Sequence, residues 1–184
     1  MKLIVAAVAL FLFGAYSSYE AVIWYLPWQQ MQVSYATWKP ANKWIHAKLQ
    51  AGKRNWVPAG NPDFLISRAT YDLSNGPLLI EGDWPKASFM VLAIYGGDTR
   101  IFGCVDSIDH QGKPYRILLR RAGSSAVVPG AEIIDAPSDK GYLVIRLLVT
   151  KILSPAEIDQ TYKSASIVPA SSELQGAKSG SKQE

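Results

Sequence analysis

The feature that most constrains this chain is a long apolar run that begins directly after Lys2. No residue from Leu3 to Tyr16 carries a charge, and the apolar character continues to Leu26 with Glu20 as the single charged side chain. A helix that spans a bilayer needs about 20 apolar residues, and this run is long enough. The sequence therefore predicts a transmembrane anchor over residues 1–27, with its helix running from about Leu3 to Leu26.

A cleaved signal peptide is the alternative interpretation of the same run. Its cleavage site would need two small residues in an A-x-A-like arrangement, and Ala15-Tyr16-Ser17 is the one passable candidate. Aromatic residues follow at the outer end of the run, where amphipathic rings are favoured at the depth of the lipid headgroups. They are Tyr16, Tyr19, Trp24, Tyr25 and Trp28. The first partner expected for this chain is therefore membrane lipid, although these rings can also pack against the following domain.

The charge at the start of the chain predicts its orientation. Lys2 is the single cation before the apolar run, and positively charged flanks tend to stay in the cytoplasm. We therefore expect a single-pass inner-membrane protein of the cell envelope, with a cytoplasmic N-terminus and a domain in the periplasm. No cysteine stands near the start of the chain, so a lipid anchor through cysteine is not expected.

Charge and cysteine content narrow the remaining possibilities. The formal net charge is +4, but the cations are scattered and form no stripe, so nucleic-acid binding is not expected. Cys104 is the single cysteine of the chain, which excludes an intramolecular disulfide. Because its neighbours between Ile101 and Val105 are apolar, we predict that its side chain is buried.

The sequence after the anchor divides into a stalk and a β domain. Residues 28–55 predict a helical stalk, in which Trp44, Ile45 and Leu49 recur near helical spacing. From residue 56 to 165 the sequence consists of short runs with β-branched residues, separated by Gly- and Pro-containing turns, and this pattern predicts a mainly β fold. About seven strands indicate a β-sandwich or a partly open barrel. They are Phe64–Tyr71, Leu78–Glu81, Ser88–Tyr95, Arg100–Asp106, Tyr115–Arg120, Ala131–Asp135 and Leu143–Val149.

Two predictions concern the C-terminal part. Ser154-Pro155-Ala156-Glu157 is typical of a helix start, with an N-cap serine, a proline at the first position and a capping-box glutamate. A short C-terminal helix is therefore predicted to run to about Ser164. Residues 166–184 are dominated by Ser, Ala, Gly, Lys and Glu, which predicts a disordered tail.

A motif at the start of the β domain resembles the signature of a known family. Asn61-Pro62-Asp63-Phe64-Leu65-Ile66-Ser67 has the form N-x-D-x-L-x-S, and Asp72-Leu73-Ser74-Asn75-Gly76-Pro77 has the form D-L-S-x-G-P after a four-residue gap. Together they resemble the family called domain of unknown function 1254, and the resemblance extends over about residues 41–163. The motif positions are Asn61, Asp63, Leu65, Ser67, Asp72, Leu73, Ser74, Gly76 and Pro77.

These motif residues have a structural interpretation. Asn61 and Asp63 can accept backbone N–H bonds around the Pro62 turn, and Asp72 and Ser74 can do the same before the turn at Asn75-Gly76. We therefore interpret the motif as architecture and not as chemistry.

The resemblance also carries expectations about fold and partners. Long members of that family hold a companion domain, number 1214, after this one, and their fold is described as all-β. This chain resembles a short, membrane-anchored form that ends before such a domain, so a separate membrane protein with the companion domain is an expected partner. The family itself has no established activity.

No group of residues predicts a reaction or a cofactor. A Ser-His-Asp triad would need His46, in the predicted stalk, or His110, in a turn between strands, and no G-x-S-x-G elbow accompanies a serine. Asp106, Asp109 and His110 could gather around a cation, but their spacing matches no metal-ligand pattern. No phosphate loop or dinucleotide fingerprint is present. We therefore expect no catalytic, metal-binding or cofactor-binding residue, and no cofactor.

Two further sets of side chains leave alternatives open. Paired carboxylates for glycosyl transfer could come from Asp63, Asp72, Glu81 and Asp83, but sequence gives no separation to test. Five arginines lie within or beside predicted strands and could line an anion site, although strand alternation favours the solvent face for several of them. They are Arg68, Arg116, Arg120, Arg121 and Arg146.

The leading hypothesis is a non-enzymatic, membrane-anchored envelope domain that binds a partner protein. The first alternative is an envelope hydrolase that uses the region of Asn61, Asp63 and Ser67. The second is a β module that binds a small apolar or anionic ligand in a pocket.

Overall fold

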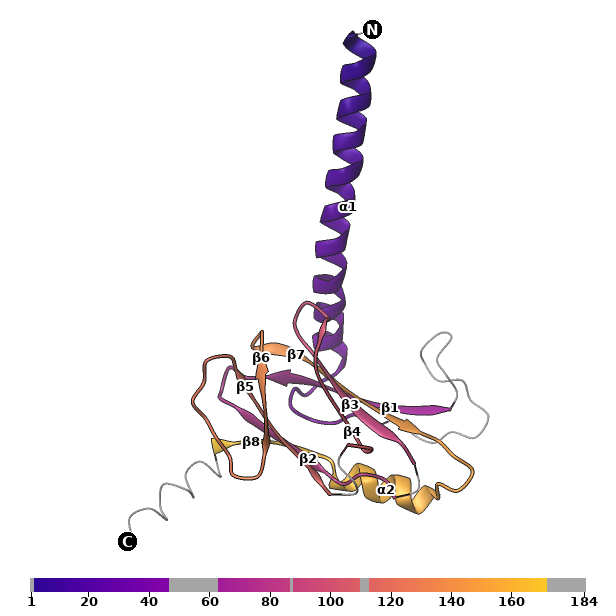
Figure 1. The fold of residues 1–184 in the computed structure, drawn as a ribbon, viewed down its shortest axis with the longest axis vertical. Coiled ribbons are helices and arrows are strands. Elements are labelled where there is room, and N and C mark those ends of the chain that lie inside the picture. The colour runs from indigo at the N-terminus through magenta and orange to yellow at the C-terminus, as the bar shows by residue number, and fades with distance from the viewer. Residues whose placement is uncertain (1, 47–62, 87, 110–112, 172–184) are drawn as a thin grey trace.

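The apolar N-terminal run forms one long helix, α1 (Lys2–Thr37), which projects from the domain (Figure 1). The structure is a computed structural model and describes residues 2–46, 63–86, 88–109 and 113–171. The prediction that the helix ends before Pro27 is wrong, because Pro27 lies inside α1. Proline removes one backbone hydrogen bond, but the turns after it are stabilised by the domain, where Met31 and Ser34 are buried.

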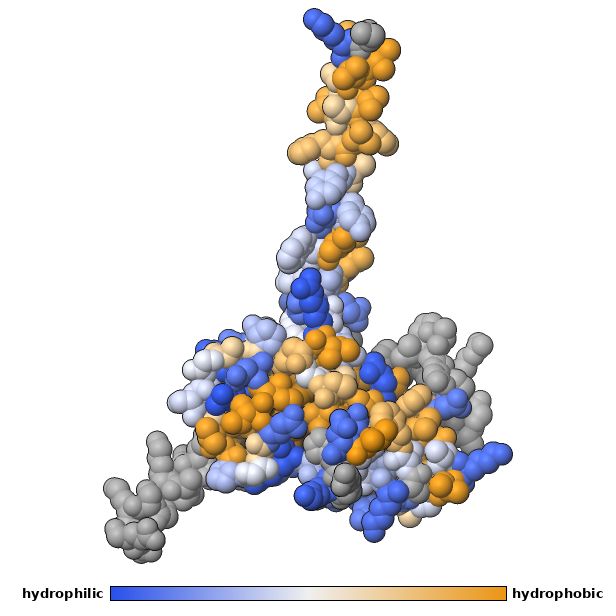
Figure 2. Space-filling model, in the orientation of Figure 1, coloured by the Kyte–Doolittle hydropathy of each residue, from blue (hydrophilic) through white to orange (hydrophobic). Residues whose placement is uncertain are grey.

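The apolar part of α1 has no partner among the described residues. None of its most apolar 18-residue window is buried, and Figure 2 shows this part as a hydrophobic rod that stands clear of the domain. Leu10, Phe11 and Phe13 are all more than two-thirds exposed. Transfer of such apolar surface out of water is strongly favourable, so the helix has the length and composition of a membrane anchor or a signal sequence.

The prediction of a helical stalk over residues 28–55 is only partly right. Residues 28–37 continue α1, but residues 38–46 are not helical and residues 47–55 lie outside the described residues. The Asn42 N–H donates to the Thr70 carbonyl over 2.7 Å, and Ile45 forms a β-bridge with Arg68. The apolar spacing that predicted a helix serves a different purpose here, because Trp44 points into the sandwich core, where its side chain is 9% exposed.

The domain is a sandwich of two four-stranded sheets. This confirms the β-sandwich, which is one of the two predicted architectures. The first sheet has the order β1-β7-β3-β4 and the second β6-β5-β2-β8. All pairings are antiparallel except β5 with β6, which is parallel. The strands are β1 (Phe64–Asp72), β2 (Leu78–Gly82), β3 (Met90–Tyr95), β4 (Ile101–Asp106), β5 (Tyr115–Arg121), β6 (Glu132–Ala136), β7 (Lys140–Leu148) and β8 (Ser166–Pro169).

The seven predicted strands all exist, with boundaries that differ by up to three residues, and β8 is an addition. The prediction that residues from 166 onward are disordered is wrong for Ser166–Pro169, which pairs with Leu78–Glu81 of β2. Composition predicted a tail because serine and alanine dominate there. The deciding contact is long-range: the Ala170 N–H donates to the Pro77 carbonyl over 2.9 Å, and Ala170 is fully buried.

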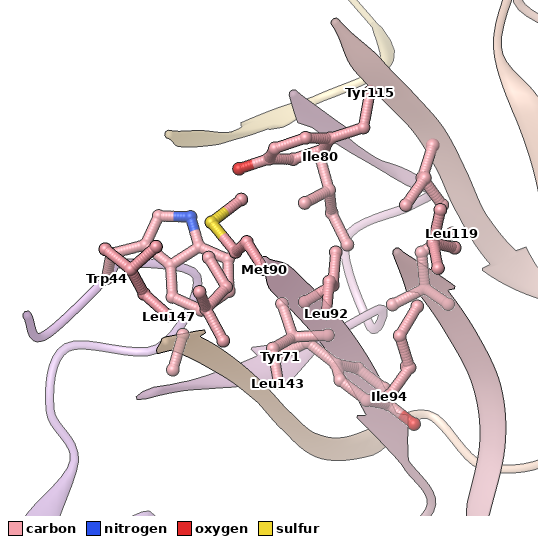
Figure 3. Close-up of a cluster of buried hydrophobic side chains, with 14 of the residues drawn as sticks. Trp44, Tyr71, Ile80, Met90, Leu92, Ile94, Tyr115, Leu119, Leu143 and Leu147 are labelled. Carbon is pink, nitrogen blue, oxygen red and sulfur yellow. The ribbon is translucent and has the colours of Figure 1, made fainter. Parts of the chain in front are cut away.

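The core lies between the two sheets and is filled by side chains from both (Figure 3). Alternate residues of a strand point to opposite faces, so β1 buries Leu65, Ser67, Ala69 and Tyr71 on one side. Neighbouring strands of the same sheet add Leu92, Ile94, Leu143 and Ile145, and the facing sheet supplies Ile80, Ile117 and Leu119, all of them almost completely buried. At about 25 cal/mol per Å² of apolar surface, this burial is the main favourable contribution to folding.

Helix α2 (Pro155–Ser164) lies at the end of the domain remote from the N-terminus of α1 (Figure 1). The prediction of an N-cap at Ser154 is confirmed, because its hydroxyl accepts a bond from the Glu157 N–H over 3.1 Å. The Glu157 carboxylate accepts from the Lys86 N–H over 2.8 Å. The residue that sequence assigned to a capping box therefore also ties α2 to the segment between β2 and β3.

The hydroxyl group of Tyr35 binds α1 to the sandwich. Tyr35 donates to the Tyr71 carbonyl of β1, and it accepts from the Gly141 N–H of β7 over 2.9 Å. The Lys140 ammonium lies 5.7 Å from the centre of the Tyr35 ring. One side chain of the helix thus satisfies backbone groups of two neighbouring strands.

We predict that Tyr35→Phe lowers the free energy of unfolding by about 1–3 kcal/mol, because two part-buried backbone groups lose their partner. Urea unfolding of the full chain in neutral detergent measures the effect, and amide hydrogen exchange should be faster at Gly141. Tyr19→Phe is the matched control, since that side chain is on the same helix and 63% exposed. Equal stability of the two variants would contradict this role for Tyr35.

Candidate functional site

The residues of the family motif are placed mainly at β1 and at the turn that follows it. Leu65 and Leu73 are buried in the core, and the Asp72 carboxylate accepts from the Ser74 N–H over 2.9 Å and pairs with Lys140 at 3.2 Å. Gly76 has a φ of 121°, a conformation that favours glycine. The Pro77 carbonyl accepts from the Ala170 N–H. Asp63 lies directly before β1, and its carbonyl accepts from the Val149 N–H. Asn61 lies outside the described residues.

Ser67 is the motif residue with the most informative neighbours. Its side chain is fully buried, and its hydroxyl lies 3.0 Å from Nδ1 of His46. The His46 ring stacks on Tyr162 of α2, with centroids 4.4 Å apart, and its centroid lies 6.3 Å from that of the Trp44 ring. This group, His46–Ser67–Tyr162, joins the segment before the sandwich, strand β1 and helix α2.

The His46–Ser67 pair has the composition of a nucleophile and its base but not the access. A substrate carbonyl must reach the serine oxygen within van der Waals contact, and Ser67 has no exposed surface. Burial also lowers the pKa of His46 and raises the pKa of Tyr162, while the Ser67 hydroxyl opposes the latter shift. A neutral imidazole packed against aromatic rings is suited to holding three elements together.

A cavity of about 790 Å³ with a mixed polar and apolar lining opens beside α2. Its wall contains the carboxylates of Asp83 and Glu157 together with Lys86, and the hydroxyl groups of Ser88 and Ser107 line it as well. Several of these groups already have protein partners: Glu157 binds the Lys86 N–H, the Ser88 hydroxyl donates to the Leu148 carbonyl, and the Ser107 hydroxyl accepts from the Met90 N–H. The cavity therefore offers a small-ligand site with few free polar groups.

The arginines of the predicted anion site do not converge. Arg116 pairs with Glu81 at 2.6 Å, Arg120 with Asp135 at 2.7 Å, and Arg121 with Asp139 at 2.5 Å. The Arg146 guanidinium donates to the Tyr95 hydroxyl, and the Arg68 guanidinium lies over the Trp38 ring at 4.9 Å. Each arginine thus has its own partner, and the set forms no common anion site.

Asp106 and Asp109, which the sequence offered as cation ligands, belong to a turn. The Asp106 carboxylate accepts from the N–H groups of Ile108 and Asp109, at 2.8 and 3.1 Å, and so closes the loop after β4. His110 lies outside the described residues. Across the part of the chain that the structure describes, no three His, Cys, Asp or Glu side chains gather as metal ligands would.

The surface feature that sequence did not single out is the open side of the sandwich, where β4 and β6 are the outermost strands of their sheets. We define the open side by Ile101 and Phe102 of β4 and by Ile133 and Ile134 of β6. Phe102 and Ile134 face the core, whereas Ile101 and Ile133 lie on the outer faces of their own sheets, opposite Tyr95 and Leu118. Ile101 and Ile133 are 56% and 39% exposed, and Phe102 and Ile134 are half-buried against the core. Figure 2 shows hydrophobic surface gathered on this part of the domain.

Gly103 explains how the two edges approach each other. A Cβ at this position would lie 3.2 Å from two atoms of Ile134, so its absence lets β6 pack against β4. The prediction that Cys104 is buried is wrong, because its side chain is exposed. Apolar neighbours indicated a buried strand, but β4 is an edge strand, and one of its faces has no covering layer among the described residues. The uncharged run Ile101–Val105 was the signal for an exposed apolar edge.

Comparison with known proteins identifies the family. Residues 41–169 match the family described as a protein of unknown function, DUF1254, and the chain belongs to that family. No curated protein matches the sequence.

Two solved structures match this chain. The VPA0106 protein of Vibrio parahaemolyticus matches with a TM-score of 0.65 and 16% identity, over 84% of this chain and 38% of that one. An uncharacterized protein from Burkholderia cenocepacia matches with a TM-score of 0.44 and 14% identity, over 81% of this chain and 40% of that one. At this identity the Vibrio structure shows a shared fold alone. This chain spans well under half the length of either protein.

The His46 environment predicts a pH dependence of stability. The ordinary pKa of 6.5 applies to the unfolded chain, and burial lowers the pKa in the folded protein. Below about pH 6.5 the unfolded chain therefore binds more protons than the folded protein does. The free energy of unfolding thus has its full value above this pH and decreases as the pH falls below it. The contribution of His46 to the slope of unfolding free energy against pH cannot exceed that of one proton, which is about 1.4 kcal/mol per pH unit.

We predict that His46→Gln flattens this dependence, because an amide can still bind the Ser67 hydroxyl but does not titrate. Urea unfolding over about pH 5 to 7.5 measures the change. His110→Gln is the control and should retain the slope that His46 contributes. A His46→Gln variant with the unchanged slope would contradict the assignment.

Proposed function

We propose that this chain is a membrane-anchored domain of the cell envelope that recognises a partner protein, with no reaction of its own. The observation that carries the proposal is the open side of the sandwich, where the core ends in the half-buried Phe102 and Ile134 and where Ile101 and Ile133 are exposed on the same two edge strands. Exposed apolar patches that are surrounded by polar residues are typical of protein–protein contact sites. A companion-domain membrane protein is the partner that the family resemblance favours.

The anchoring part of the proposal rests on α1. Its apolar residues lie away from the domain, and a bilayer is the environment that removes them from water. The positive-inside rule and Lys2 favour a cytoplasmic N-terminus and a periplasmic domain. The last turns of α1 bind the sandwich through Tyr35, so the domain stays close to the membrane surface. A partner in the same bilayer is then within reach at high effective concentration.

The non-enzymatic part rests on the environment of the polar groups. Ser67, which the hydrolase alternative would use, is fully buried, and the carboxylate of Asp72 pairs with Lys140. Asp83 and Glu157 both line the cavity beside α2. The Glu157 carboxylate, however, accepts a hydrogen bond from the Lys86 N–H, and this bond holds α2 in place. These contacts favour structural roles for the residues that a hydrolase would need.

The orientation can be tested with single-cysteine variants in a Cys104→Ser background. We expect a membrane-impermeant maleimide to label Ile152→Cys in spheroplasts without lysis, since Ile152 is 75% exposed and lies away from the open side. Lys2→Cys is the matched control and should react only after lysis. The reverse pattern would contradict a periplasmic domain, and soluble release of the labelled chain would indicate a cleaved signal peptide.

Partner recognition can be tested with a photoreactive phenylalanine analogue placed at Ile101 in living cells. We expect a discrete cross-linked membrane protein from position 101 and none from the control position Ile152, which is also apolar and exposed. Cys104→Asp should abolish the cross-link at position 101, because Cys104 is exposed on the same face of β4 and the charge would lie on the surface that the partner covers. Absence of a product at position 101, or equal products at both positions, would contradict the proposal.

A further inference from the structure

A groove lies between α1 and the sandwich, near the point where the helix leaves the domain. It is a cavity of about 680 Å³, and we call it the α1 groove. One wall holds Thr99, from the turn between β3 and β4, and Tyr142 of β7. The other wall is formed by α1, through Leu26, Pro27, Gln29, Gln30 and Val33. Figure 1 shows the turn between β3 and β4 beside the C-terminal part of α1.

Helix geometry places this groove relative to a bilayer in the proposed membrane-anchored state. The hydrocarbon layer is about 30 Å thick, which takes about 20 residues of helix at about 1.5 Å per residue. Counted from Leu3, where the apolar run begins, this layer ends near Val22. The headgroup layer adds about 5–7 Å on each side, or about four or five residues. Leu26 and Pro27, at one end of the groove, therefore lie at the level of the lipid headgroups.

Aromatic side chains of α1 indicate the same level independently. Trp24, Tyr25 and Trp28 are 74%, 54% and 57% exposed, and the ring centroids of Tyr25 and Trp28 are 5.9 Å apart. Rings of this amphipathic kind gather at the boundary between hydrocarbon and water. These positions lie on both sides of Leu26 in the sequence, so the rings and the helix length place the same end of the groove at the membrane surface.

The lining of the groove matches the chemistry of a phospholipid at this depth. Leu26 and Val33 supply apolar contact for the first carbons of the acyl chains. Gln29, Gln30 and Thr99 carry amide and hydroxyl groups that can donate to ester and phosphate oxygens. Among the described residues that line the groove, none carries a charge. An apolar helix of another protein would remove these donors from water without satisfying them, which disfavours it as the occupant.

The turn between β3 and β4 adds a cation beside the groove. Arg100 directly follows Thr99, and its side chain is 84% exposed. It pairs with Asp98 at 3.6 Å, but an ion pair this exposed contributes little. A guanidinium group suits phosphate, because its N–H donors match the phosphate oxygens in pairs. A headgroup that holds both a phosphate and an ammonium group complements the adjacent charges of Arg100 and Asp98.

The backbone of Thr99 is strained at this point. Its φ of 66° lies in the left-handed region, which β-branched residues rarely adopt and which glycine adopts without strain. The turn is closed by a hydrogen bond from the Thr99 N–H to the Gly96 carbonyl over 3.0 Å. Strained positions of this kind cluster at functional sites. The side chain of Thr99 is what the turn contributes to the groove, so a role in binding is consistent with its presence there.

We propose that the α1 groove binds the glycerophosphate part of a membrane phospholipid from the leaflet that faces the domain, with the phosphate beside Arg100. The bound lipid lies between the helix and the sandwich and holds the domain in one orientation against the membrane. This inference rests on the anchoring part of the proposed function and adds a lipid site on the domain itself.

The test uses the full chain in uncharged detergent, with phosphatidylethanolamine added at increasing mole fraction. A photoreactive phenylalanine analogue replaces Gln30, and intact-protein mass spectrometry measures the lipid adduct. We expect an adduct of one lipid per chain that saturates, and the analogue at Gln29 gives a second reading if the first one blocks the groove. Gln32 is the matched control, because it is exposed and lies about 200° further around α1. Its adduct should rise without saturation.

Protein variants show which groups bind the lipid. Arg100→Gln should raise the lipid mole fraction at half-saturation about tenfold, because a charge-assisted contact to phosphate is lost. Thr99→Gly should raise it about fivefold, because the hydroxyl contact is lost. The midpoint of urea unfolding of Thr99→Gly should not fall, since glycine adopts the same φ without strain. Lys151→Gln removes an exposed cation next to α2 and is the control that should change nothing.

A lipid without phosphate separates the headgroup from the acyl chains. Diacylglycerol with the same chains should bind about tenfold more weakly than phosphatidylethanolamine, and Arg100→Gln should not change its binding. Equal binding of the two lipids would show that the groove recognises acyl chains alone and would overturn the proposal.

The remaining outcomes separate this inference from the function on which it rests. Adducts that do not saturate at positions 29 and 30, or a saturable adduct unaffected by both Arg100→Gln and Thr99→Gly, would overturn the lipid site. A protein adduct from position 30 in cell membranes would show that a partner fills the groove and would also overturn it. Capture of a partner from position 101 beside any of these results leaves partner recognition standing. A saturable, Arg100-dependent lipid adduct without a captured partner would support the lipid site and contradict the recognition role. Soluble release of the chain would contradict the anchor and the lipid site together.

Discussion

Burial of apolar side chains between two four-stranded sheets is the interaction on which the rest of this structure depends. Residues such as Ile80, Leu92 and Ile145 have almost no exposed surface, and they come from strands far apart in the sequence. With one cysteine in the chain, no intramolecular disulfide can substitute for this packing. The core in turn fixes the positions of the sheet edges, and these edges decide which surfaces are closed and which are open.

The closed side and the open side of the sandwich have different physical origins. Trp44 fills the core near β1, and the stack of His46 on Tyr162 joins α2 to the same side. At the other side, β4 and β6 approach each other only because Gly103 has no side chain between them and Ile134. The core is thus closed by covalently connected segments on one side and ends in partly exposed apolar residues on the other.

The helix adds a positional constraint to this asymmetry. Tyr35 binds backbone groups of β1 and β7, so the sandwich is attached to the end of α1 and does not hang from a free linker there. In the proposed membrane-anchored state, a domain held in this way has a restricted set of orientations relative to the bilayer. Restricted orientation raises the effective concentration of a surface toward a partner in the same membrane, which is the physical basis of the proposed recognition role.

The sequence by itself determined the apolar helix, the seven central strands and the start of α2. These features depend on local information: an uncharged run, alternation between turn residues and the Ser154-Pro155-Ala156-Glu157 cap. The family motif is equally local, and the Asp72 carboxylate accepts from the Ser74 N–H at the turn that follows β1.

Only the tertiary structure decided the passage of α1 through Pro27, the strand Ser166–Pro169, the exposure of Cys104 and the open side between β4 and β6. Each of these depends on contacts between segments that are distant in the sequence, because a helix or strand is stabilised there by its neighbours and not by its own residues. Composition cannot show which strand lies at a sheet edge, and the candidate site of this protein is an edge.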